Sequence, residues 1–336
     1  MSGPSVLVTG ASGFIGTHLV RRLIALGFHA HCLVRPTSAV DALRATGALP
    51  IVGDVADRAG VARALAISKA GVVFHLAGLV RATRAQDFMR VNAGGVDAVA
   101  AACAQQAAPP VLVLVSSMAA AGPSGEAPMA EGEPPRPVSD YGRSKLAGEN
   151  AATRYADAVP VTIVRPCVVF GAGDRGIFEV FKPIARSGIH VVPGRGDRRV
   201  SLIAVADVVE AIVLAARAGE RVAGDDPGRG IYFAAAEDLS HRELGVAIAR
   251  ALGRTGPRIV RLPEWAMRAM ALGGDVVSGI RRQPGWIGRD KIAELLAGSW
   301  TCSSAKARRQ LRWSPAAPLA DRLRETAQWY RDAGWL

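Results

Sequence analysis

A tyrosine and a lysine four residues apart, Tyr141 and Lys145 in the run SDYGRSKLAGE, are the clearest candidates for chemistry in this sequence. In a helix, side chains at this spacing share one face, so the Lys145 ammonium can lie close to the Tyr141 phenol and stabilise its phenolate. A tyrosine in that setting would work as an acid or a base near neutral pH. The same pair also fits the exposed start of an ordinary helix, and only the rest of the chain can separate the two interpretations.

The N-terminal run VLVTGASGFIGTHLV has the residues to bind phosphate groups. Gly10 allows a tight turn after a strand, Gly13 lets the backbone approach a pyrophosphate, and Gly16 lets the following helix pack closely against the strand. The N-terminus of that helix would face the phosphates. The run therefore predicts a dinucleotide-binding turn.

Short apolar strands alternate with helices through the first half of the chain, and these elements must position both motifs. The expected strands are SVLVTG, HAHCLVR, ALPIVGD, GVVFHLAG, PVLVLVSS and PVTIVRP, and helices are expected over 13–26, 40–46, 59–67 and 91–107 and at Tyr141. Such alternation is typical of a parallel sheet with helices on both faces. The predicted fold class is α/β, a Rossmann-type doubly wound parallel sheet with a smaller, mostly helical C-terminal substrate domain.

The alternation changes after Pro166, where the Gly-rich loops FGAGDRG and PGRGDRR begin, and the C-terminal part is predicted as helices joined by Gly and Pro turns. We therefore assign residues 1–168 and 202–236 to an NAD(P)-binding Rossmann domain. Residues 169–201 and 237–336 are assigned to a substrate-binding domain that covers the C-terminal edges of the strands.

Composition narrows the class of protein. With 336 residues and 50% hydrophobic content, the chain can bury a large core. The four cysteines are widely spaced without a CxxC pair, so we predict neither a metal site nor disulfides, and a cytoplasmic location. No apolar run reaches the roughly 18 residues of a membrane span. The charge of +12 comes from scattered arginines without interleaved aromatics, which argues against a nucleic-acid partner. An arginine-rich composition explains this charge, and attraction of an anionic cofactor or substrate into a cleft is the weaker interpretation.

Further motifs follow in order along the chain: FHLAG, then VNAGGV with Asn92, then VSS, then Tyr141 with Lys145. Together with the glycine run they resemble the extended short-chain dehydrogenase/reductase family, which includes NAD(P)-dependent epimerases, dehydratases and 3β-hydroxysteroid dehydrogenase-like enzymes. The resemblance implies that Tyr141 is the catalytic acid or base, and that Lys145 lowers its pKa and holds the nicotinamide ribose. It also implies that Ser117, in preference to Ser116, hydrogen-bonds the reacting oxygen, and that Asn92 bonds backbone and orders a water near Lys145.

The resemblance further implies a cofactor site formed by the glycine turn, the strand ends and the Tyr–Lys helix. Its residues are Thr9, Gly10, Ser12, Gly13, Phe14, Ile15, Gly16, Arg35, Asp54, Val55, Leu76, Ala77, Gly78, Tyr141, Lys145, Pro166 and Val168. Asp54 matches the acid that meets the adenine amine. The end of the second strand, where an acid would bind the ribose 2′-hydroxyl of NAD, holds Arg35, which can pair with a 2′-phosphate. NADP(H) is therefore the predicted cofactor, with NAD(H) as the alternative.

Two residues that commonly bind the nucleotide in this family are absent from the sequence, and their absence indicates the class of substrate. Family members that act on nucleotide sugars commonly grip the nucleotide with an Asn and an Arg, and Val168 and Val200 stand at those positions here. Arg198 or Arg199 could still serve. The pattern is more similar to the branch of 3β-hydroxysteroid dehydrogenases and dihydroflavonol-type reductases, whose substrates are larger and more apolar. A later segment could line an apolar pocket over the nicotinamide with Trp265, Met267, Met270 and Leu272.

These features predict an oxidoreductase that transfers hydride between the nicotinamide and a ketone or secondary alcohol of a fairly apolar, steroid-, flavonoid- or lipid-like small molecule. The alternative is a nucleotide-sugar epimerase or dehydratase that retains its dinucleotide. A third reading, from a different class, is a non-catalytic cofactor-binding sensor, because fold does not fix function. The intact set of Ser117, Tyr141 and Lys145 argues against a sensor. The family suggests a homodimer through the helices that begin near Asn92 and Tyr141.

Overall fold

The larger part of the protein is a seven-stranded sheet in which all neighbouring strands are parallel. In the computed structural model, which describes residues 3–194, 197–224, 226–281, 285 and 288–336, the strand order is β10-β6-β5-β4-β1-β2-β3. The strands are β1 (Ser5–Thr9), β2 (His29–Val34), β3 (Leu49–Val52), β4 (Val72–His75), β5 (Val111–Val115), β6 (Val161–Pro166) and β10 (Ile231–Ala234). The predicted doubly wound parallel sheet is confirmed. The strand order reverses between β1 and β4, which is where such sheets bind ligands.

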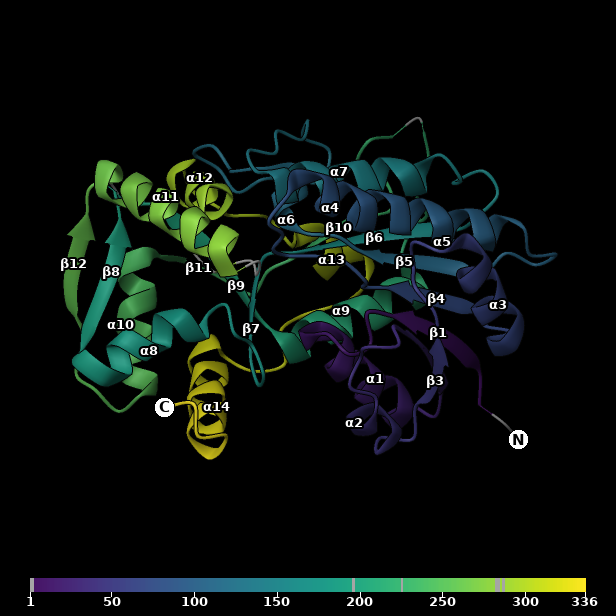
Figure 1. The fold of residues 1–336 in the computed structure, drawn as a ribbon, viewed down its shortest axis with the longest axis horizontal. Coiled ribbons are helices and arrows are strands. Elements are labelled where there is room, and N and C mark those ends of the chain that lie inside the picture. Colours follow the sequence, from purple (N-terminus) through teal and green to yellow (C-terminus); the bar gives the residue numbers. More distant parts are fainter. Residues whose placement is uncertain (1–2, 195–196, 225, 282–284, 286–287) are drawn as a thin grey trace.

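Helices cover both faces of this sheet, as Figure 1 shows. One face carries α3 (Arg58–Ser68), α5 (Gly94–Ala104) and α7 (Asp140–Thr153). The other carries α1 (Phe14–Ala25) and α9 (Val205–Ala218). Shorter helices are α2 (Asp41–Arg44), α4 (Ala85–Phe88) and α6 (Met118–Ala121).

The helix predicted over 91–107 differs from the observed one at its start. Helix α4 continues through a π-helical turn, η1 (Met89–Ala93), into α5, so the helical run begins at Ala85. A π-helical turn inserts an extra residue into the helical repeat and is often found at functional sites. Here the turn contains Asn92.

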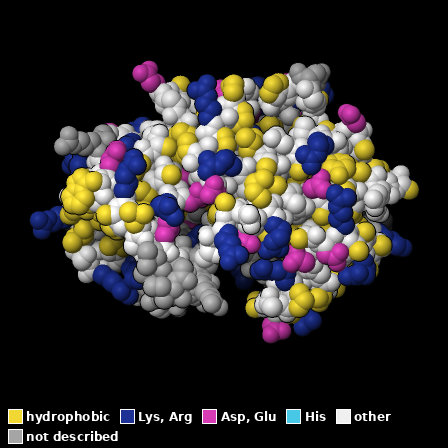
Figure 2. Space-filling model, turned by 45° about the horizontal axis from the view of Figure 1, so that its top comes forward, with side chains coloured by type: hydrophobic (Ala, Val, Ile, Leu, Met, Phe, Trp, Pro, Cys, Tyr) yellow, Lys and Arg dark blue, Asp and Glu magenta, His cyan; other side chains and the backbone are white. Residues whose placement is uncertain are grey.

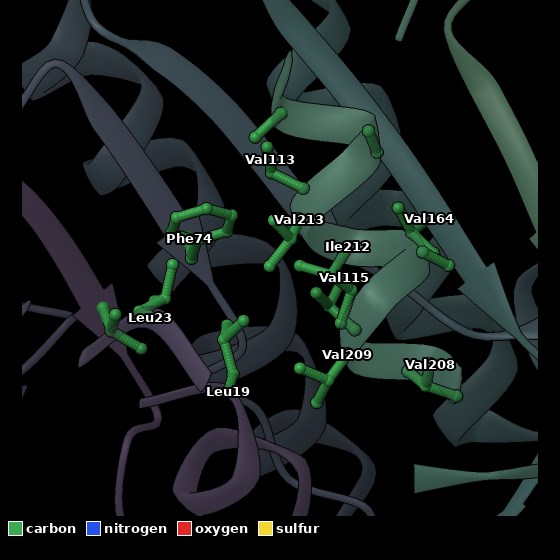
Figure 3. Packing of buried hydrophobic residues seen from close by; sticks show 14 of the residues in the cluster. Leu19, Leu23, Phe74, Val113, Val115, Val164, Val208, Val209, Ile212 and Val213 are labelled. Atoms are coloured by element: carbon green, nitrogen blue, oxygen red, sulfur yellow. The ribbon is translucent and has the colours of Figure 1, made fainter. Parts of the chain in front are cut away.

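The core beneath α1 and α9 holds these helices against the strands whose ends form the candidate site. Figure 3 shows side chains of α1, α9 and three strands meeting in one apolar layer. The residues labelled there are Leu19, Leu23, Phe74, Val113, Val115, Val164, Val208, Val209, Ile212 and Val213. Burying a side chain of this size contributes about 1.5 to 3 kcal/mol. The strands and the start of α1 are therefore fixed relative to each other.

The smaller part of the protein follows the end of β6 and contains two small sheets as well as helices. β7 (Val168–Phe170), β9 (Arg199–Ala204) and β11 (Glu237–Ser240) form one sheet, and β8 (Ile189–Pro193) pairs with β12 (Arg258–Leu262) in the other. The helices are α8 (Phe178–Ser187), α10 (His241–Ala251), α11 (Glu264–Arg281), α12 (Arg289–Leu296) and α14 (Leu319–Asp332). Within the described residues, no helix has both the length and the apolar character of a membrane span.

One C-terminal segment packs back onto the larger sheet, although the sequence analysis places it in the smaller domain. Helix α13 (Ala305–Gln310) and the residues after it bring Ala307, Leu311 and Trp313 into the apolar layer of Figure 3. The Trp313 indole Nε1 donates to the carbonyl oxygen of Asp207 in α9 at 3.0 Å. The chain therefore connects the two parts several times.

Candidate active site

The turn after β1 leaves the N-terminus of α1 open. Gly10 has a φ of +71°, and a Cβ at this residue would lie 2.6 Å from the Ala77 nitrogen, so only glycine fits. A Cβ on Gly16 would lie 2.1 Å from the Gly10 carbonyl oxygen. Gly13 precedes α1, and no side chain caps the free N–H groups of its first turn. These N–H groups and the exposed backbone at Ser12 and Gly13 fit a pyrophosphate.

The ends of β1 and β4 are joined by side-chain hydrogen bonds next to this turn. The Thr9 hydroxyl lies 2.8 Å from His75 Nδ1 and accepts from the Ala77 N–H at 3.3 Å. The segment Leu76–Ala77 then runs beside Gly10. Phe14 and Ile15, at the start of α1, are half-buried. The turn and the β4 end are therefore one rigid unit.

The residues predicted to hold the adenosine half follow the neighbouring strands. Arg35 is exposed directly after β2, and Asp54 is half-buried after β3, where its carboxylate accepts from the Ala56 N–H at 2.9 Å. Val55 is buried against Gly95 of α5. All three lie at the same edge of the sheet as the glycine turn, because β2 and β3 run parallel to β1.

Ser117, Tyr141 and Lys145 meet at the C-terminal ends of β5 and β6. Ser117 is the N-cap of α6, where its hydroxyl accepts from the Ala119 N–H at 3.1 Å, and it also hydrogen-bonds the Tyr141 side chain. Lys145 is buried and donates to the Val115 carbonyl oxygen at 2.9 Å. Ser116 is buried, and its hydroxyl has no hydrogen-bond partner in the described part of the chain. The structure therefore places Ser117 at the phenol.

The electrostatics of the pair differ from the expectation based on spacing. Burial raises the pKa of Tyr141 to about 12, the hydrogen bond with Ser117 opposes this increase, and the charge of Glu294 adds to it. Burial also lowers the pKa of Lys145 to about 8, and the charge of Glu149 opposes that decrease. The stabilisation of the phenolate that the spacing suggests is not seen in this structure, because the pKa of Tyr141 is raised and the Lys145 ammonium donates to the Val115 carbonyl.

Asn92 connects the π-helical turn to the loop after β4. Its amide nitrogen donates to the Leu79 carbonyl and to the Ser144 hydroxyl, both at 2.9 Å, and its oxygen accepts from the Leu79 N–H at 2.7 Å. A Cβ on Gly78 would lie 3.0 Å from the Asn92 oxygen and 3.9 Å from Lys145 Nζ. Asn92 thus fixes this loop beside Lys145 through backbone bonds, as the sequence analysis expects.

The structure adds two carboxylates that the sequence did not indicate. Asp290 of α12 accepts from the backbone N–H groups of Asp140 at 2.5 Å and Tyr141 at 3.3 Å, and so caps α7 from outside. Glu294, one turn later, accepts from the Ser139 hydroxyl at 2.7 Å. No local motif marks these residues, because their partners lie about 150 positions earlier in the chain. The smaller part therefore sets the start of the Tyr141 helix.

The remaining predicted residues are the last two of the cofactor site and the four of the expected apolar pocket. Pro166 and Val168 end β6 and begin β7 beside the Ser117 loop, and Val168 is half-buried. Of the apolar residues expected over the nicotinamide, Met267 is buried against Ile292, whereas Trp265 is 74% exposed. Met270 and Leu272 are also exposed. Met267 therefore belongs to the small core between α11 and α12, and the apolar pocket wall over the nicotinamide stays a prediction.

Comparison with known proteins identifies the family. Residues 6–227 match the NAD dependent epimerase/dehydratase family. This chain belongs to that family. The predicted resemblance to extended short-chain dehydrogenases/reductases is thereby confirmed, and the family consists of NAD-dependent enzymes.

Relatives of this family member carry out more than one reaction. The ceramide reductase of Caulobacter vibrioides is 34% identical over 98% of this chain and 96% of its own length. The 4-hydroxy-2-methyl-3-oxo-4-farnesyl-3,4-dihydroquinoline-1-oxide ketoreductase of Stigmatella aurantiaca is 30% identical over 90% of both chains. Among solved structures, MoeE5 in complex with UDP-glucuronic acid and NAD superposes with a TM-score of 0.74 at 27% identity, over 98% of this chain and 99% of that chain.

Proposed function

We propose that this protein is an NADP(H)-preferring reductase that transfers hydride between the nicotinamide and a ketone or secondary alcohol of a fairly apolar small molecule. The choice of reaction rests on the positions that bind the nucleotide in nucleotide-sugar enzymes. In this structure their side chains are buried or engaged in other contacts. Val200 is buried in the core of the smaller part. Arg198 pairs with Glu264 at 3.0 Å, and Arg199 donates to the Asp238 carbonyl at 2.7 Å.

Both arginines that could replace the usual nucleotide anchor are thus engaged in structural contacts. Arg198 also donates to the Leu295 carbonyl at 3.1 Å, and its side chain is only 17% exposed. Arg199 also pairs with Glu243 at 3.4 Å. A nucleoside diphosphate bound here would have to break these contacts, whereas an apolar substrate would not.

Ser117 and Tyr141 would hold the reacting oxygen between two hydroxyl groups. A phenol with a pKa of about 12 is protonated at neutral pH, so Tyr141 is set to donate its proton to a carbonyl oxygen. Lys145 would hold the nicotinamide ribose, and Asn92 would hold the loop beside Lys145. These roles favour reduction of a ketone at neutral pH.

The cofactor residues fit NADP(H). The open first turn of α1 would bind the pyrophosphate, and Arg35 would pair with the 2′-phosphate. One carboxylate oxygen of Asp54 accepts from the Ala56 N–H, and the other would accept a hydrogen bond from the adenine amine. Bound NADPH would supply the hydride from C4 of its nicotinamide. Two relatives named for ceramide reduction and for a farnesylated quinoline oxide support an apolar substrate.

A nucleotide-sugar epimerase is the second candidate, and the similarity to MoeE5 with UDP-glucuronic acid favours it. Calorimetric titration with UDP, dTDP and GDP, with NADPH as the positive control, separates the two. We expect NADPH to bind and the three diphosphates to show no binding in the micromolar range, because each unpaired polar group would cost about 1 to 3 kcal/mol. Micromolar binding of any of the three diphosphates would refute the reductase proposal.

A further inference from the structure

The carboxylate of Glu149 lies one helical turn beyond Lys145 on α7 and has no part in the chemistry described above. Glu149 is 3% exposed and Lys145 is 7% exposed, and residues at this spacing share one helix face. A buried ionised carboxylate is costly unless it is paired. The buried position of the Glu149 carboxylate, one helical turn beyond Lys145, therefore requires an explanation.

Arg165 of β6 fixes the Glu149 carboxylate. Its Nε donates to Oε1 at 2.9 Å and its Nη2 donates to Oε2 at 2.6 Å, and both side chains are 4% exposed. Such a bidentate pair restrains the orientation of the carboxylate as well as its distance. The guanidinium is held in turn by the Phe233 ring, 5.6 Å from its centroid.

Lys145 is a buried cation whose hydrogen bond goes to a neutral group, the Val115 carbonyl. Burial alone would favour its neutral form, and the negative charge of Glu149 opposes this. No hydrogen bond joins the two side chains in the described structure, so Glu149 acts on Lys145 through space.

The other titratable or charged groups around this face of α7 do not supply that negative charge. His75 of β4 is uncharged at neutral pH, because burial and, to a smaller extent, the Lys145 charge together lower its pKa to about 3. Tyr141 is a neutral phenol. Arg165 is a cation, and Glu131 faces Arg165 and the Phe233 N–H. Glu294 faces Tyr141 and Ser139.

We propose that Glu149 is a positioning residue for the reaction: its carboxylate, restrained by Arg165, keeps the buried Lys145 ammonium protonated. Glu149 acts through Lys145 and touches neither substrate nor cofactor. The inference rests on the proposed function, in which the charged Lys145 binds the nicotinamide ribose. A buried ion pair adds little net stability compared with an apolar pair. Stabilisation of the fold is therefore a weaker explanation for the Glu149–Arg165 pair than the placement of a negative charge for Lys145.

The protonation of Lys145 can be measured directly, because the chain has only five lysines, Lys69, Lys145, Lys182, Lys291 and Lys306. We would label lysine with ¹³C at Cε, assign the Lys145 signal by its loss in Lys145→Met, and titrate the 336-residue chain by NMR. In Glu149→Gln, which keeps the size of the side chain but removes its charge, the Lys145 midpoint should fall by about one pH unit or more.

The matched control is Asp207→Asn, which neutralises another buried carboxylate. Asp207 is 2% exposed, accepts from the Ala316 N–H at 2.9 Å and pairs with Arg322 at 3.4 Å. This variant should lose stability as Glu149→Gln does but leave the Lys145 midpoint unchanged. An unchanged midpoint in folded Glu149→Gln, or an equal fall in Asp207→Asn, would overturn the proposal.

If Glu149→Gln does not fold, Glu149→Asp replaces it, because the shorter side chain withdraws the carboxylate without removing the charge. Its Lys145 midpoint should fall by less, and an unchanged midpoint would again overturn the proposal. The titration is done without substrate, so its result is separate from whether the protein reduces ketones. In turnover with NADPH, the alkaline limb of the kcat/KM profile of Glu149→Gln should move to lower pH.

Discussion

At the scale of single residues, Tyr141 is held as a neutral acid. Its pKa of about 12 means that it gives a proton readily only to an oxygen that gains charge, as a carbonyl oxygen does when hydride arrives. Oxidation of an alcohol would instead need the phenolate. The proposed reductase should therefore reduce its ketone at neutral pH, and any alcohol oxidation should rise toward alkaline pH.

Replacing Tyr141 by Phe should abolish turnover, with kcat lower by at least about 10²-fold, because the proton donor is lost. NADPH affinity should stay within about twofold, since the ring and its contact with Phe88, at 6.0 Å between centroids, remain. Steady-state rates and cofactor titration measure the two effects. Near wild-type activity in this variant would remove Tyr141 from the chemistry.

The protonated Lys145 side chain should lower the free energy of unfolding at pH values below its folded-state pKa. Its pKa falls from 10.5 to about 8 on folding, so the folded protein binds the proton less tightly than the unfolded chain does. The penalty is fully present below about pH 8 and disappears as the pH rises to the unfolded value. Lys145→Met should therefore be more stable than wild type at pH 7. The expected net gain is about 1 to 2 kcal/mol, because loss of the hydrogen bond to the Val115 carbonyl offsets part of the removed penalty.

Thermal unfolding of Lys145→Met and wild type at pH 7 and pH 10 measures this effect. The difference between the two proteins should shrink at pH 10, where the wild-type lysine is mostly neutral. A variant that is equally destabilised at both pH values would show that burial imposes no penalty on this ammonium.

Arg35 is the residue on which the NADP(H) proposal depends. Arg35→Ala should weaken NADPH binding by about 1.5 to 3 kcal/mol, the scale of a hydrogen bond to a charged group, and should change NADH binding far less. Isothermal titration with both cofactors gives the comparison. Equal losses for NADPH and NADH would exclude Arg35 from the discrimination.

At the scale of elements, the local patterns predicted what depends on local sequence. Continuous apolar runs such as VLVLV predicted β5, and the glycine spacing predicted the turn before α1, because burial on both faces and close packing leave direct traces in the sequence. The contacts of Asp290 and Glu294 with the start of α7 left none, since they join segments far apart in the chain. The pKa of Tyr141 was also out of reach, because it depends on burial by elements that the spacing does not specify.

The cap from α12 should matter for Tyr141. Asp290→Ala leaves the N–H groups of Asp140 and Tyr141 without their carboxylate, which should cost about 0.5 to 2 kcal/mol of stability. Because the same turn carries Tyr141, kcat should fall more than cofactor affinity. The control is Asp140→Asn, which removes only an exposed pair with Arg143. Equal effects of the two variants would contradict a role for the α12 cap.

At the scale of the whole molecule, the two parts are joined at the candidate site. Helix α12 of the smaller part caps the Tyr141 helix of the larger part, and α13 returns to the larger sheet (Figure 1). Positive side chains are distributed over the surface in Figure 2 and do not form one continuous basic band on that face. This face therefore presents no continuous basic track, and the absence of a nucleic-acid partner stays a prediction.

We also propose a homodimer through α5 and α7, as the family suggests. Asp97 of α5 already joins Arg58 and Arg154 at the outer side of these helices, with Arg154 at 2.9 Å. Sedimentation equilibrium would show twice the mass of the 336-residue chain. A monomer at working concentrations would refute the dimer.

The central claim is net hydride transfer to a ketone, and isotope transfer tests it most directly. NADPH carrying deuterium at C4 on the transferable side would be incubated with the protein and, in separate reactions, a panel of long-chain, cyclic and aryl ketones or a nucleotide sugar, with Tyr141→Phe as the inactive control. We predict that NADPH is consumed and that deuterium is recovered at the carbinol carbon of the product. Redox-neutral conversion of a nucleotide sugar, with no NADPH consumed and no deuterium in the product, would contradict the account and establish an epimerase.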